Sequence, residues 1–275
     1  MQNIIKKFSH YETWYLVQDE DGTEYVLLLE TIGNKIPDLH SFYFHIACHE
    51  DIIFPLDMVC ESGQLNQDCK VGYLYPMDVL EWSPLEELKL EKKEDKAAFL
   101  KNLHALLKEI HEEIYMMGID IRQIYQQNGR IKIRYNGFKN YARNSIYKIP
   151  EDKAGEYEPY ILDYFSFFVL MFEIMYQWHP YMGNRTSYSM EEDARYYAFS
   201  QSPIFIFDPK NESNRIGFLM SQKEVIQRWE DSEPAIRKYF IDIFNLDRIK
   251  KYTQRELSTL AEVFIFDYTR TDWFK

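Results

Sequence analysis

The chain has 275 residues, of which 44 are acidic and 32 basic, so its formal net charge is −12. This length allows one large domain or two lobes with a sizeable core. The negative charge argues against broad binding to nucleic acid or to an anionic membrane, because both need a positive protein surface.

The cysteines and the N-terminus indicate a reducing compartment. Cys48, Cys60 and Cys69 form no Cys-x-x-Cys pair, which argues against a zinc site or a disulfide scaffold and favours the cytoplasm. The first residues show no long apolar run and no small-residue cleavage site, so no signal peptide is expected.

The first part of the chain has the composition of β-strands. "WYLVQ" and "EYVLLLE" are rich in β-branched and aromatic residues and flank "DEDGT", whose Asp-Gly predicts a hairpin turn. Further apolar segments follow at 51–59 and 71–79. Residues 1–80 are therefore predicted to form a small β-rich lobe.

The hydrophobic period then changes to that of a helix. Between residues 94 and 118, apolar side chains recur at spacings of three and four, which predicts one long helix with Gly118 as its C-cap. His104 and His111 lie seven residues apart, whereas a metal-binding pair prefers a spacing of four, so both are interpreted as ordinary helix residues. Asn-Gly in "IYQQNGRIKI" predicts a second hairpin.

The remainder is predicted to be helical. A buried helix begins near Asp163, and its apolar run 164–178 is shorter than a membrane span and contains Glu173. Capping boxes at 189, 221 and 253 mark three further helix starts. The segment 202–215 reads as an ordered loop with an apolar plug. The 22 Tyr and 19 Phe favour an aromatic core over the alternative of a ligand site.

The order of these segments resembles the protein kinase fold, and several motifs are similar to segments of bacterial kinase-like proteins. "VGYLYPMDV" resembles the strand that enters the kinase hinge, and "DYFSFFVLMFEIMYQWHPYMG" resembles the central helix of the large lobe. Asp163 stands in the place of that helix's buried, structural Asp. The resemblance implies a two-lobed α+β fold, with an N-lobe at 1–80 and a helical C-lobe at 81–275.

The groups that a kinase uses to hold ATP are missing. The resemblance places the phosphate-covering loop at 9–13, where no glycine is present, and the phosphate-binding Lys at Leu28. No Lys or Arg occurs from 8 to 34. No Asp or Glu occurs from 121 to 150, and the segment matching Asp-Phe-Gly contains Tyr135 instead of the metal-binding Asp. The expectation is a pseudokinase without metal or cofactor.

The catalytic loop allows two alignments, and neither completes it. If Asp120 is the catalytic Asp, the metal-binding Asn falls at Tyr125; spacing back from the hairpin gives Gly118 and Gln123 instead. The alternative interpretation of Asp120 is a solvated or helix-capping carboxylate.

The same acid-free window is rich in positive charge. It is interpreted either as a ring of ion pairs with the acidic remainder or as a docking surface for an acidic or phosphorylated protein segment. Its members are Arg122, Arg130, Lys132, Arg134, Lys139, Arg143 and Lys148. The sequence thus predicts a non-catalytic regulator that binds a protein, with neither nucleic acid nor membrane as partner. The alternatives are a non-kinase transferase (nucleotidyl transfer or glutamylation) and a small-molecule sensor.

Overall fold

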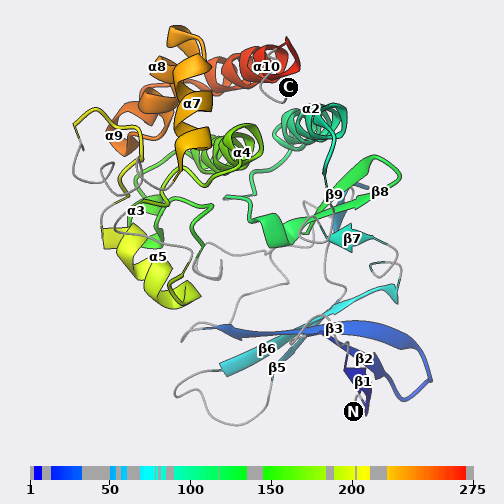
Figure 1. The fold of residues 1–275 in the computed structure, drawn as a ribbon. Coiled ribbons are helices and arrows are strands. Elements are labelled where there is room, and N and C mark those ends of the chain that lie inside the picture. Colours follow the sequence, from blue (N-terminus) through cyan, green and yellow to red (C-terminus); the bar gives the residue numbers. More distant parts are fainter. Residues whose placement is uncertain are drawn as a thin grey trace. The chain divides into compact units, whose positions relative to one another are not determined.

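The computed structural model describes residues 3–7, 14–32, 50–53, 57–60, 69–77, 79, 82–84, 90–116, 118–134, 145–183, 189–201, 203–210 and 222–270. The fold is α+β. The chain divides into two compact units, of which unit 1 comprises Met1–Leu88 and Arg122–Ala142, and unit 2 comprises Lys89–Ile121 and Arg143–Lys275. Within the described ranges, the strands belong to unit 1 and the α-helices to unit 2 (Figure 1).

Unit 1 contains a five-stranded antiparallel sheet with the order β1-β2-β3-β6-β5. Its strands are β1 (Asn3–Lys7), β2 (Trp14–Gln18), β3 (Glu24–Ile32), β5 (Asp57–Cys60) and β6 (Cys69–Tyr75). Val17, Leu27 and Leu74 form a buried cluster on it. The predicted Asp-Gly hairpin joins β2 to β3, where the Asp19 amide donates to the Thr23 carbonyl at 3.0 Å.

Unit 1 also contains a four-stranded sheet with the order β4-β9-β8-β7. Its strands are β4 (Ile52–Ile53), β7 (Ser83–Pro84), β8 (Ile124–Gln127) and β9 (Arg130–Arg134). The predicted Asn-Gly hairpin joins β8 to β9, and Asn128 and Gly129 both have positive φ, 51° and 82°. This hairpin pairs with β4 and with β7, and the segment Arg122–Ala142 is part of unit 1.

Unit 2 is helical. Its α-helices are α2 (Lys93–Ile110), α3 (Glu151–Ala154), α4 (Pro159–Tyr176), α5 (Glu192–Gln201), α7 (Lys223–Asp231), α8 (Pro234–Ile243), α9 (Leu246–Ile249) and α10 (Gln254–Arg270). The central helix is α4, which packs against α2, α7 and α10 (Figure 1). By length and composition α4 could cross a membrane, but 78% of it is buried inside the protein, as expected for a core helix.

Aromatic side chains fill the core around α4. The ring of Phe172 lies 5.2 Å from that of Phe240 and 5.5 Å from those of Phe205 and Phe244, measured between ring centroids. Phe205 comes from the segment 203–210, so the predicted apolar plug is buried as expected. The core interpretation of the aromatic residues is confirmed for these side chains.

The ends of two helices test the predicted boundaries. The capping box at 253 is confirmed, since the Thr253 amide donates to Glu256 Oε2 at 2.8 Å and the Glu256 amide to Thr253 Oγ1 at 3.3 Å. The prediction that one helix runs from 94 to 118 is wrong at its C-terminal end, because α2 ends at Ile110 with His111 as its C-cap. Gly118 does have a positive φ of 95°, but it lies in the loop beyond the helix.

Candidate functional site

Asp163 is a fully buried carboxylate on α4 that accepts three hydrogen-bond contacts. Its Oδ1 accepts the Gly118 amide at 2.6 Å, and its Oδ2 accepts the Met116 amide at 2.8 Å. The same Oδ2 lies 3.0 Å from His111 Nε2, and both side chains have no exposed surface. This carboxylate captures the backbone after α2, which explains why the chain leaves the helix before Gly118. Asp163 therefore anchors the segment that follows α2 to α4.

His111 connects this anchor to α10. Its other ring nitrogen, Nδ1, lies 3.4 Å from the side-chain amide of Gln254, the first residue of α10. The ring also packs edge-on against Tyr164 at 5.5 Å. Three helices of unit 2 therefore meet at one buried imidazole, which fits the interpretation of His111 as a structural residue.

Asp120 is buried, with only 3% of its surface exposed. The interpretation of Asp120 as a solvated carboxylate is therefore wrong. It directly precedes the 3-10 helix η3 (Ile121–Gln123), which is the position of a helix-capping residue. Among the described residues, no group of three or more His, Cys, Asp or Glu could hold a metal ion.

The two catalytic-loop alignments place the metal-binding Asn at Gln123 or at Tyr125, and both residues contact or belong to the four-stranded sheet. Gln123 is buried and donates from Nε2 to the Arg134 carbonyl at 3.1 Å. Tyr125 is buried on β8 and pairs with Lys132. Both side chains are therefore buried within or beside the hairpin that they support.

The structure describes only some of the positions at which the resemblance places the phosphate-binding and metal-binding groups of a kinase. Leu28 lies in the middle of β3, where it pairs with Trp14 on β2 and with Tyr73 on β6. The position of the expected lysine is thus on a central strand. The predicted phosphate-covering loop at 9–13 lies outside the described residues, and so does Tyr135.

The predicted basic set is divided between different environments. Arg130 pairs with Glu50 at 2.7 Å and with Asp51 at 2.6 Å, and its hydrogen bond to Asp51 is the largest cause of its raised pKa. The Lys132 ammonium lies 4.7 Å from the centre of the Trp82 ring, a cation–π distance. Arg134 and Lys148 are buried, and Lys148 packs beside Gly118.

The ion-pair interpretation therefore describes Arg130, while burial removes Arg134 and Lys148 from any exposed docking surface. Arg122 is half-buried. Lys139 and Arg143 lie outside the described residues. On the described hairpin Arg130 is exposed and Lys132 is half-buried.

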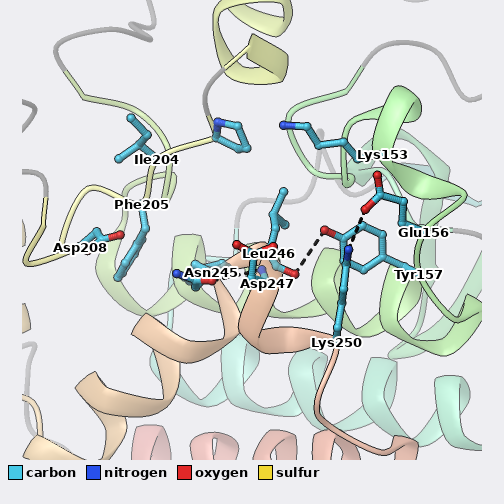
Figure 2. A pocket seen from close by; sticks show the side chains of 12 residues that line it. Lys153, Glu156, Tyr157, Ile204, Phe205, Asp208, Asn245, Leu246, Asp247 and Lys250 are labelled. Carbon is cyan, nitrogen blue, oxygen red and sulfur yellow. Dashed lines mark hydrogen bonds and ion pairs between the residues drawn. The ribbon is translucent and has the colours of Figure 1, made fainter.

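A pocket of about 360 Å³ lies within unit 2, and the sequence did not predict it. Three segments form it: the end of α3 with the residues that follow it, the segment 203–208, and the chain from Phe244 through α9. Figure 2 shows Lys153 on one side, Ile204, Phe205 and Asp208 on another, and Asn245 to Asp247 beneath them.

The polar groups of the pocket differ in their contacts. Lys250 is paired with Glu156 at 2.7 Å and lies 4.6 Å from the centre of the Tyr157 ring (Figure 2). The Tyr157 hydroxyl donates to the Leu246 carbonyl at 3.3 Å. Asn245 caps α9 by accepting the amides of Asp247 and Arg248. In the sequence these residues signal only turns and helix ends, so no local pattern could have revealed the cavity.

Comparison with known proteins gives no family assignment. No protein-family model matches the chain, and no curated protein matches it significantly.

Proposed function

We propose that this chain is a catalytically inactive, kinase-like protein that regulates a partner protein by binding it. The observation that carries the proposal is the buried Asp163 carboxylate, bound to the amides of Met116 and Gly118. This is the structural role that the kinase resemblance implies for Asp163. A buried, hydrogen-bonded carboxylate at this position supports the proposal.

The order of elements is consistent with the same resemblance. A five-stranded antiparallel sheet is followed along the chain by α2, by the β8–β9 hairpin and then by the buried helix α4. This is the order of strands, helix, hairpin and central helix in the resemblance.

Charged groups for phosphoryl transfer are missing from two windows where the resemblance places them. No Lys or Arg lies between 8 and 34, and no Asp or Glu lies between 121 and 150. Phosphoryl transfer depends on positioned cations and on metal-binding carboxylates, and their joint loss removes its main electrostatic stabilisation. A chain that keeps the folding residue and lacks these groups is better suited to binding than to catalysis.

For the partner, we propose a protein with an acidic or phosphorylated segment that contacts the cations Arg130 and Lys132 of the β8–β9 hairpin. Lys132 is the better candidate of the two, since Arg130 already has two carboxylate partners. Charge-assisted hydrogen bonds to carboxylate or phosphate are the strong ones in recognition.

The experiment is a thermal-shift titration of the full chain with ATP, ADP and GTP, each with magnesium, with manganese and with neither. A ligand that binds only the native state raises the melting temperature. We expect no shift with any nucleotide, and no phosphate transfer from radiolabelled ATP to the chain or to a generic protein substrate.

A metal-dependent shift would contradict the proposal and would favour the non-kinase transferase. Asp120→Asn would then show whether that carboxylate is responsible, with Glu112→Gln as a matched control. Glu112 is exposed, and its carboxylate makes no hydrogen bond or ion pair among the described residues.

A further inference from the structure

The pocket in unit 2 has both signs of charge with unused bonding capacity. The ammonium of Lys153 has one described contact, a long one of 3.5 Å to the Ser200 carbonyl. A lysine ammonium can donate three hydrogen bonds, so most of its capacity is open. Figure 2 shows Lys153 extending along the upper side of the pocket. The pocket therefore offers a cation that can receive an anionic group.

Two carboxylates supply the opposite charge. Asp208 uses Oδ1 to accept the Lys210 amide at 2.9 Å, and within the described ranges its Oδ2 accepts no hydrogen bond. The Asp247 carboxylate is exposed and likewise accepts no hydrogen bond from the described residues. In Figure 2, Asp208 and Asp247 lie on different sides of the pocket from Lys153.

The remaining charged pair does not compete for a ligand. Lys250 and Glu156 neutralise one another at 2.7 Å, and the Tyr157 ring holds Lys250 in place. Excluding this pair, the lining has one positive and two negative groups. A ligand with a single charge would leave groups of the opposite kind without a partner, or would be repelled by them.

Apolar side chains form the rest of the lining. Phe205 and Phe244 are 2% exposed and form a rigid base, and Ile204 is half-buried beside them. The volume of about 360 Å³ lies near the lower end of the range of ~300–1,000 Å³ that is typical of ligand pockets. A small ligand with one apolar part fits both the size and the lining.

We propose that this pocket binds a free α-amino acid with an apolar side chain. Its carboxylate contacts Lys153, its ammonium contacts Asp247, and its side chain lies against Ile204 and Phe205. This inference does not depend on the proposed lack of kinase activity, because the pocket lies entirely within unit 2.

The experiment starts with a thermal-shift screen of the twenty proteinogenic amino acids, followed by calorimetry on the best binder and on leucine. Two analogues of leucine each lack one charge: 4-methylpentanoate has no ammonium and 3-methylbutan-1-amine has no carboxylate. We expect saturable binding of an apolar amino acid and at least tenfold weaker binding of each singly charged analogue of leucine.

Four variants test the assignment of the charges. Lys153→Met and Asp247→Asn are each expected to weaken binding at least tenfold. Lys251→Met and Glu112→Gln are the matched controls, because both residues are exposed outside the pocket and should leave the affinity unchanged. The melting temperature of each variant without ligand establishes that it is folded.

Three outcomes would overturn the proposal. The first is that none of the twenty amino acids binds. The second is that an analogue with one charge binds as tightly as leucine, which would indicate a simple anion or cation site. The third is that Lys153→Met and Asp247→Asn bind as the controls do. A melting-temperature shift caused by nucleotide would contradict the proposed function but not the amino-acid site. The failure of one proposal can therefore be distinguished from the failure of the other.

Discussion

Asp163 places a carboxylate where water does not reach, and the free energy of that arrangement depends on its three contacts. Replacement by Ala would leave the amides of Met116 and Gly118 and the imidazole of His111 without an acceptor. Each unsatisfied buried group costs about 1–3 kcal/mol. We therefore expect Asp163→Ala to lower the free energy of unfolding by at least about 3 kcal/mol.

Urea unfolding followed by circular dichroism measures this loss as a lower midpoint with an unchanged slope. Asp163→Asn keeps the side-chain volume and one oxygen, so it should lower the free energy of unfolding by less than Asp163→Ala does. The control is Glu262→Gln, which breaks an ion pair with Lys108 whose two side chains are 56% and 53% exposed. Such a pair contributes less than about 1 kcal/mol. If Asp163→Ala were as stable as this control, the anchor would have no structural role.

At the scale of secondary-structure elements, the local signals were sufficient where the chemistry is local. Asp-Gly and Asn-Gly predicted both hairpins, and Thr253 with Glu256 predicted the start of α10. In each case the residues that determine the turn or cap are within five positions of one another. Sequence reasoning could therefore find these elements without knowledge of the core.

The errors arose where a distant residue decides the outcome. The apolar spacing continues beyond Ile110, but Asp163, more than forty residues later, captures the amides of Met116 and Gly118 and ends the helical path. Asp120 is buried by packing that its neighbours do not reveal. The pocket is assembled from three separated segments, so its charged groups have no spacing that a motif could record.

The β8–β9 turn allows a test of one element alone. Gly129 has φ 82°, and a Cβ added to it would meet nothing within 4 Å. The effect of Gly129→Ala is therefore confined to backbone conformation, and an L-residue in the left-handed region costs about 1–2 kcal/mol. We expect a loss of stability of this size, measured by urea unfolding.

Gly155→Ala is the matched control for this change. Gly155 also has free space around its Cα, but its φ is −64°, which any residue adopts. Its replacement should leave stability unchanged or raise it by about 0.4–1 kcal/mol, because alanine restricts the unfolded chain. Equal effects of the two substitutions would mean that the turn does not need a positive φ at residue 129.

At the scale of the whole molecule, stability depends on pH through opposing effects. A chain with a net charge of −12 repels itself at neutral pH, and acidification reduces that repulsion. Buried neutral histidines act in the other direction. Burial lowers the pKa of His104 to about 4 and that of His179 to about 3, from an ordinary value of 6.5.

The sign for His104 follows from where the proton binds. The unfolded chain takes up a proton near pH 6.5, whereas the folded chain does so only near pH 4, so acidification stabilises the unfolded state over this window. The contribution to stability is complete above about pH 6.5 and is lost as the pH falls toward 4. Glu262 opposes the lowering of this pKa, whereas Lys108 and His111 add to it.

Lowering the pH from 7.5 to 5.0 reduces the free energy of unfolding of the unmodified chain. We expect this reduction to be about 2 kcal/mol smaller in His104→Gln. The two chains share every carboxylate, so the difference between their pH profiles isolates the histidine from the repulsion term. Ser258→Ala is the control, because it removes the 3.2 Å contact to His104 Nε2 but keeps the titrating ring. It should lower stability by a similar amount at both pH values. A His104→Gln profile parallel to that of the unmodified chain would show that this imidazole is protonated as readily in the folded state as in the unfolded one.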